Sequence, residues 1–166
     1  MFKARNILFG LVPLFISQLA FAGTATGTLS VTANVATACS VGVATNLLPF
    51  GTYTSGVDLD VNGALQVTCT ATANYNIALD AGSGVGATIP TRILTNPSPA
   101  GTLQYTIYTD PTRTTVWGNG TTGSTVAGVG TGAAQSVTVP GRIFASQTGT
   151  VSPGNYTDTV NITVNF

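Results

Sequence analysis

Residues 156–166 read Tyr-Thr-Asp-Thr-Val-Asn-Ile-Thr-Val-Asn-Phe, and they alternate between two kinds of side chain. Successive side chains of a β-strand point to opposite faces, so strict alternation of apolar and polar residues indicates a strand with one buried face. Asp158 is the one polar residue on the apolar face. The stretch predicts a half-buried strand whose inner face carries Tyr156, Val160, Ile162, Val164 and Phe166.

The same alternation occurs near the other end of the chain, over residues 25–35. Threonine, serine and asparagine fill the positions on one face. The other face is made of small and aliphatic residues, namely Ala25, Gly27, Leu29, Val31, Ala33 and Val35. This pattern predicts a second strand with one buried face.

The region between these two segments shows further period-two stretches, over residues 64–70, 75–80, 102–109 and 135–139. Turn signals separate them, including Asn62-Gly63 and Pro153-Gly154. Short strands at such spacing indicate an all-β sandwich or barrel. The glycine-rich stretch 118–134 has low complexity and predicts a long loop.

The composition excludes several classes of function. Charged residues make up 6% of the 166 residues, Lys+Arg and Asp+Glu both number 5, and histidine is absent. Nucleic-acid binding through phosphates needs a basic patch that this chain lacks. General-base and zinc chemistry usually need histidine. We therefore expect no catalytic residues, no metal and no cofactor.

The first 22 residues have the layout of a secretory signal peptide. Lys3 and Arg5 precede an apolar run over residues 7–20, and Ala20-Phe21-Ala22 forms a small-x-small cleavage site. The run is shorter than the roughly 20 residues of a spanning helix. We expect cleavage after Ala22 and no stable membrane insertion.

The chain contains two cysteines, Cys39 and Cys69. An even pair in an exported chain predicts a disulfide. A metal pair or a nucleophile is the alternative, but neither has a supporting histidine.

Two other motifs have some features of binding sites. Asp58-Leu-Asp60-Val-Asn62-Gly63 matches the first half of a calcium loop, but the twelfth position is Cys69, and an Asn-Gly turn is the favoured interpretation. Trp117 with Tyr105 and Tyr108 could stack on a sugar, although core packing explains the same residues.

Three motifs in the second half of the chain together resemble those of the spore coat protein U domain family, which includes the Csu-type pilins of archaic chaperone–usher fimbriae. The central motif runs from Tyr105 to Gly120 as YTIYTDPTRTTVWGNG. Gly141-Arg-Ile143 and the closing stretch from Pro153 to Phe166 resemble the other two, and Cys39 and Cys69 fit the paired cysteines of the family. The resemblance covers nearly all of residues 24–166.

The resemblance implies an immunoglobulin-like sandwich that lacks its last strand and is completed by donor-strand complementation. Residues 1–22 would be the signal peptide, 23–35 the N-terminal donor-strand extension, and 36–166 the sandwich domain. The donor residues would be those of the 25–35 face. The acceptor groove would be bordered by Tyr156, Val160, Ile162, Val164 and Phe166.

The function that this resemblance implies is that of a structural subunit of a surface fimbria. Its partners would be other pilin subunits in a homopolymer, a periplasmic chaperone and an outer-membrane usher, and it would be exported through the periplasm to the cell surface or secreted. The alternatives are a secreted spore-coat-type structural protein and a carbohydrate-binding tip adhesin.

Overall fold

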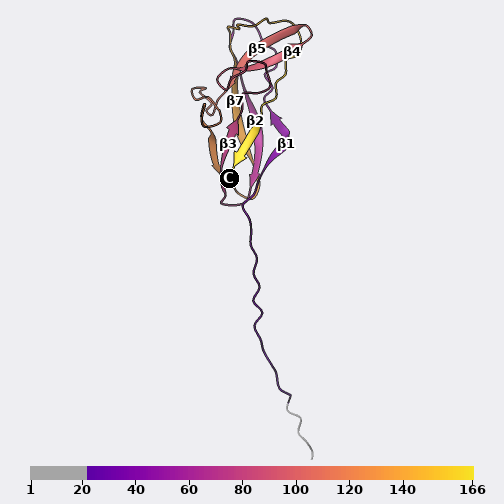
Figure 1. The fold of residues 1–166 in the computed structure, drawn as a ribbon, viewed down its shortest axis with the longest axis vertical. Helices are drawn as coiled ribbons and strands as arrows, with labels where there is room; N and C mark the ends of the chain where they lie inside the picture. Colours follow the sequence, from indigo (N-terminus) through magenta and orange to yellow (C-terminus); the bar gives the residue numbers. More distant parts are fainter. Residues whose placement is uncertain (1–21) are drawn as a thin grey trace, which may run out of the picture. The chain divides into compact units, whose positions relative to one another are not determined.

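The computed structural model describes residues 22–166, and at residues 43–46 it describes the backbone alone. The predicted signal peptide therefore lies outside the described residues, apart from Ala22. The described part contains strands and no helix (Figure 1), and so no helix that could cross a bilayer. The strands are β1 (Cys39–Leu47), β2 (Leu59–Cys69), β3 (Asn74–Leu79), β4 (Arg92–Pro97), β5 (Ala100–Ile107), β6 (Val126–Val129), β7 (Ala134–Ile143) and β8 (Ile162–Asn165).

These strands form two sheets in which neighbouring strands pair antiparallel. The larger sheet has the order β1-β2-β7-β5-β4, and the smaller has the order β6-β3-β8. The longest ladder joins β2 to β7, with Leu59 opposite Ile143 at one end and Thr68 opposite Ala134 at the other. The two sheets confirm the all-β sandwich that the strand spacing predicts and the immunoglobulin-like fold that the family resemblance implies.

The core lies between the two sheets and is built from the inner faces of their strands. β2 contributes Leu65 and Val67, and β3 contributes Tyr75 and Ile77, all at most 4% exposed. Trp117 is fully buried, and its indole N–H donates to the backbone oxygen of Ile77 at 2.9 Å. Because the ring is enclosed, the sugar-stacking alternative for Trp117, Tyr105 and Tyr108 is wrong: these residues are 0%, 3% and 7% exposed.

A buried arginine connects the loops beside this core. Arg92, at the start of β4, is 0% exposed. Its guanidinium donates to the backbone oxygens of Asp80, Ile89 and Trp117 at 2.9, 3.0 and 2.8 Å. Burial lowers the pKa of Arg92, and the nearby Tyr105 and acidic groups oppose that shift. The side chain thus satisfies two buried carbonyls, those of Ile89 and Trp117, and the partly buried carbonyl of Asp80.

The predicted Asn62-Gly63 turn is wrong, because β2 runs straight through these residues. Gly63 is needed for a close approach: a Cβ there would collide with the backbone oxygen of Leu47. The acidic residues of the motif that matches half of a calcium loop are paired with Arg142 instead. Arg142 donates to both carboxylate oxygens of Asp60, at 2.6 and 2.8 Å, and lies 3.5 Å from Asp58.

The predicted loop over residues 118–134 is only partly a loop. Its residues Val126–Val129 form β6, which pairs with β3 from Asn74 to Ile77. Gly128 permits this pairing, because a Cβ there would collide with the ring of Tyr75. A glycine-rich composition predicts flexibility but does not reveal that one glycine makes room for an aromatic ring.

The predicted strand over residues 25–35 is absent from the described chain. Residues 22–38 form no strand and are exposed, with Leu29 at 87% and Val31 at 82%. The compact unit of the chain spans Val35–Phe166 and holds all eight strands of the described residues. A strand needs a partner edge for its backbone groups, and these residues have none in a single copy.

Candidate functional site

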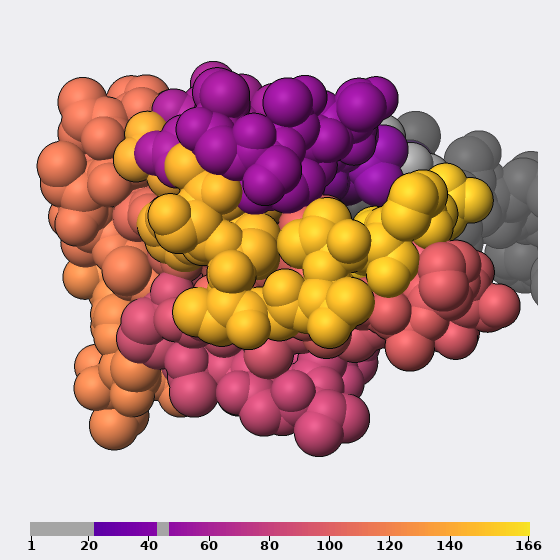
Figure 2. Space-filling model, turned by 90° about the horizontal axis from the view of Figure 1, so that it is seen from above, coloured from indigo at the N-terminus to yellow at the C-terminus, as the bar shows by residue number. Residues whose placement is uncertain are grey.

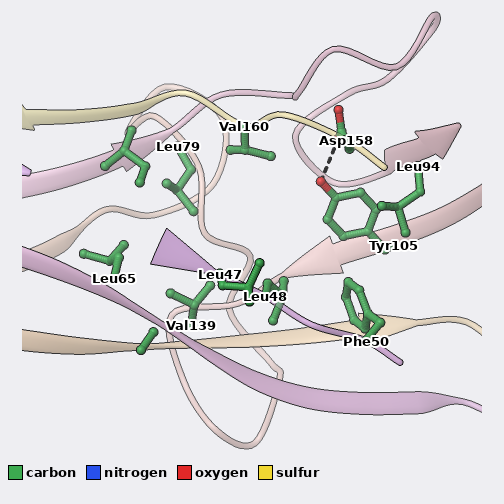
Figure 3. A pocket seen from close by; sticks show the side chains of 12 residues that line it. Leu47, Leu48, Phe50, Leu65, Leu79, Leu94, Tyr105, Val139, Asp158 and Val160 are labelled. Carbon is green, nitrogen blue, oxygen red and sulfur yellow. Dashed lines mark hydrogen bonds between the residues drawn. The ribbon is translucent and has the colours of Figure 1, made fainter. Parts of the chain in front are cut away.

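An apolar groove opens within the sandwich domain beside the C-terminal segment, which we define as residues 156–166. One part is a cavity of about 200 Å³ whose walls include Leu65, Leu79, Val139, Val160 and Ile162. Figure 3 shows Val160 and Leu79 on one side of this cavity, facing Leu65 and Val139 on the other. We call this part the deep cavity.

A second, wider part adjoins the deep cavity and shares Leu47, Leu48, Phe50 and Leu94 with it. This wide cavity has a volume of about 660 Å³ and reaches to Tyr156 and Val151. Phe50 also packs edge-on against Tyr105, with ring centroids 5.6 Å apart. The two parts together form one continuous, mainly apolar groove.

Unpaired strand edges accompany this groove. β1 is the last strand on one side of the larger sheet, and β8 is the last strand on one side of the smaller sheet. The C-terminal segment lies between the β1 region and the β3 region in Figure 2. An edge strand presents N–H and C=O groups that an added strand can bind. The groove therefore combines apolar cavities with backbone groups suited to strand addition.

The C-terminal segment has the alternation that its sequence predicts. Thr157, Thr159, Asn161, Thr163 and Asn165 are exposed, whereas Tyr156, Asp158, Val160, Ile162 and Val164 are partly buried. Of the predicted groove residues, Val160 and Ile162 line the deep cavity and Tyr156 lines the wide one. Val164 packs against the core without lining either cavity, and Phe166 is 61% exposed.

Polar contacts hold the C-terminal segment in place. Asp80, at the end of β3, accepts hydrogen bonds from the backbone and side chain of Asn161 at 2.9 and 2.6 Å. Burial alone would raise the pKa of Asp80, but these bonds and one from the Gly82 N–H lower it. Thr157 and Thr95 exchange backbone hydrogen bonds at 2.9 and 3.0 Å. The segment is thus attached both to β3 and to β4.

One carboxylate interrupts the apolar groove. Asp158 borders the deep cavity and accepts a hydrogen bond from the Tyr105 hydroxyl at 2.7 Å (Figure 3). Its other oxygen accepts from the N–H and hydroxyl of Ser83, both at 2.8 Å. Burial and the Asp158 carboxylate raise the pKa of Tyr105 well above its usual range, so Tyr105 remains a donor.

The disulfide lies at the start of the sandwich domain. Cys39 and Cys69 are bonded, as predicted, and they are opposite each other in the β1–β2 ladder. The Thr70 hydroxyl contacts the backbone of Ala36 and Ala38 beside it. All six predicted donor residues precede this bridge and are exposed.

Sequence reasoning missed most of the groove, since it predicted only Tyr156, Val160 and Ile162 among the residues that line it. Leu47, Leu48 and Phe50 belong to it, and they stand in an apolar run, Leu-Leu-Pro-Phe, that was the available signal. Leu79 and Leu94 belong to β3 and β4, and only the folded sheets bring them near Val160. Among the described residues no cluster of three His, Cys, Asp or Glu side chains could hold a metal.

Comparison with known proteins gives consistent results. The model of the spore coat protein U domain matches residues 25–163. Protein U of Myxococcus xanthus is 39% identical over 158 residues, which cover 87% of each chain. A crystal structure of the CsuC–CsuE chaperone–tip adhesion subunit pre-assembly complex from archaic chaperone–usher Csu pili of Acinetobacter baumannii matches with a TM-score of 0.55 at 20% identity. That match covers 80% of this chain and 40% of the matched chain, and it supports the fold alone.

Proposed function

This chain belongs to the spore coat protein U domain family, and from that premise we propose that it is a structural subunit of a surface fimbria assembled by the chaperone–usher route. Each copy would polymerise by inserting its N-terminal segment, residues 25–35, into the groove of the next copy. The observation that carries the proposal is the open apolar groove in a chain whose own alternating N-terminal segment has no strand partner.

The chemistry of the N-terminal segment and of the groove supports their association. Leu29, Val31 and Val35 are 87%, 82% and 79% exposed, which is costly for aliphatic side chains in water. Burying each would contribute about 1.5–3 kcal/mol. The inserted backbone would also pair with an edge strand, which is the recognition mode of β-strand addition. Head-to-tail addition of this kind does not close on itself and yields a fibre.

The proposal assigns residues 1–22 to a signal peptide, 23–35 to the donor-strand extension and 36–166 to the receiving domain. A periplasmic chaperone would cover the groove before assembly, and an outer-membrane usher would exchange the chaperone for the next subunit. The chain would leave through the periplasm and reside in a fimbria on the cell surface. The chaperone complex in the matched crystal structure supports this choice of partner by analogy of fold.

A secreted coat protein is the second candidate, and the match of residues 25–163 to the spore coat protein U domain favours it. In that case the groove would be filled without fibre growth. A sugar-binding tip adhesin has less support, because Trp117, Tyr105 and Tyr108 are buried in the core.

The deciding experiment deletes residues 23–34 from the chain expressed with its chaperone and usher. Fibres seen by electron microscopy should disappear, while the chaperone-bound subunit should still be recovered from the periplasm. A matched variant with Thr26, Thr28, Thr32 and Asn34 changed to serine alters only the outward positions and should still assemble. Fibres from the deletion variant would contradict the donor role, and absence of fibres from the wild-type chain would favour the coat protein.

A further inference from the structure

We propose that Asp158 fixes the register of insertion, with Ala33 of the incoming segment opposite it and Leu29 and Val31 filling the deep cavity. This inference rests on the proposed function and specifies how the groove would select its strand. It starts from the one carboxylate on the inner face of the C-terminal segment.

The Asp158 carboxylate is held in a fixed position beside the deep cavity. Tyr105 and Ser83 bind its two oxygens from different directions. The backbone of Gly82 also passes so close that a Cβ there would collide with the carboxylate. Because the group is locked by these contacts, it cannot turn away to admit a large aliphatic side chain. The incoming residue opposite Asp158 must therefore be small.

The C-terminal segment offers inward positions two residues apart, and each has a different environment. Ile162 and Val160 face the deep cavity, Asp158 presents the carboxylate, and Tyr156 faces the wide cavity. An incoming strand fits best if its inward residues are large opposite Ile162 and Val160, small opposite Asp158, and large opposite Tyr156. Side chains directly opposite each other on neighbouring strands share a face, so the incoming strand needs the same spacing.

The N-terminal segment contains this order once. Leu29, Val31, Ala33 and Val35 are large, large, small and large. Inserted antiparallel, they would lie opposite Ile162, Val160, Asp158 and Tyr156 in that order. Val35 would then occupy the wide cavity of about 660 Å³.

The parallel alternative fits less well. It would set Gly27 opposite Asp158 and leave only Ala25 for the wide cavity. Val35 would then lie opposite Phe166, which lines neither part of the groove. The existing ladders of both sheets are antiparallel, and antiparallel insertion beside β8 would extend that pattern.

Cysteine cross-linking in assembled fibres tests the register directly. The proposed alignment sets Thr28 of one copy opposite Thr163 of the next, whereas the parallel alignment sets it opposite Thr159. All three residues are exposed. The Thr28→Cys/Thr163→Cys double variant should give a ladder of covalent multimers on a non-reducing gel, and the Thr28→Cys/Thr159→Cys variant should not. Each single variant controls for adventitious bonds, since it can form dimers at most.

Electron microscopy of the same samples distinguishes a wrong register from a wrong donor function. Fibres that fail to cross-link through Thr28→Cys/Thr163→Cys would overturn the register and leave the donor function standing. A wild-type chain that forms no fibres with its chaperone and usher would overturn both.

A matched pair of enlarged side chains tests whether Asp158 limits the size of the incoming residue. Ala33→Leu would press a large side chain against the locked carboxylate and should reduce fibre yield at least tenfold. Thr32→Leu, the same final side chain at the neighbouring outward position, is the control and should keep most of the yield. Wild-type yield from Ala33→Leu, or an equal loss from Thr32→Leu, would overturn the role of Asp158.

Discussion

The N-terminal and C-terminal segments carry the same two-residue alternation, yet in one copy of the chain only the C-terminal segment is docked on the sheets. Residues 162–165 pair with β3, and Asp80 and Asp158 attach the preceding residues through side-chain hydrogen bonds. Residues 25–35 are exposed and form no strand. Alternation thus determines which face of a segment is apolar, whereas partner groups determine whether the segment docks.

Arg92 donates to the backbone oxygen of Asp80, whose side chain binds Asn161 of the docked segment. Removing Arg92 is therefore the test with the largest expected effect. Arg92→Met should lower the free energy of unfolding by about 3–5 kcal/mol, because two buried carbonyls and one partly buried carbonyl lose their donor. Urea unfolding followed by tryptophan fluorescence measures the loss. Arg142→Met, the same change at an exposed ion pair, should cost about 1 kcal/mol or less. Equal losses in the two variants would contradict the anchoring role of Arg92.

Both cysteines lie between the N-terminal and C-terminal segments in the sequence. Their disulfide should therefore affect the stability of the domain and not the N-terminal segment. Changing Cys39 and Cys69 to serine should lower the free energy of unfolding by about 3–4 kcal/mol, since a loop of 30 residues is then free in the unfolded state. Thermal unfolding of the two forms provides the measurement. An unchanged melting temperature would show that the bridge is not structural.

A matched pair of charges compares the segments themselves. Ile162→Asp places an unpaired carboxylate in the groove and should cost about 2–3 kcal/mol. Leu29→Asp should change the stability of the isolated domain by less than about 0.5 kcal/mol, because Leu29 is exposed there. Denaturant unfolding of purified monomers measures both. A comparable loss from Leu29→Asp would mean that the N-terminal segment docks in its own groove.

The smallest effect concerns pH. Hydrogen bonding by Arg142 lowers the pKa of Asp60, and hydrogen bonds lower that of Asp80 against its burial. A lowered folded-state pKa stabilises above the unfolded value of about 3.9 and loses that effect as the pH falls further. The raised pKa of Tyr105 stabilises below about pH 10 and is lost above it. Stability should therefore be flat from about pH 5 to 9, and a transition near pH 6–7 would contradict this account.

The sequence predicts those features that depend on residues close together in the chain, and it fails for those that depend on contacts between distant residues. The two faces of the C-terminal segment and the Cys39–Cys69 bridge follow from spacing and composition. The Asn62-Gly63 turn failed because glycine there serves close packing against Leu47, which is 16 residues away in sequence. The groove wall of Leu48, Leu79 and Leu94 could not be found by periodicity, because three separate strands or loops meet there.

The bridge between Cys39 and Cys69 also has a mechanical consequence. In a fibre built as proposed, tension enters each subunit through the residues just before Cys39. The bridge passes this load covalently to β2, which has β1 and β7 as neighbours in the larger sheet. Stretching would then load a strand inside the sheet, and the hydrogen bonds of the edge strand β1 would be spared. Single fibres can be pulled before and after reduction of this disulfide. The unfolding force should be lower after reduction.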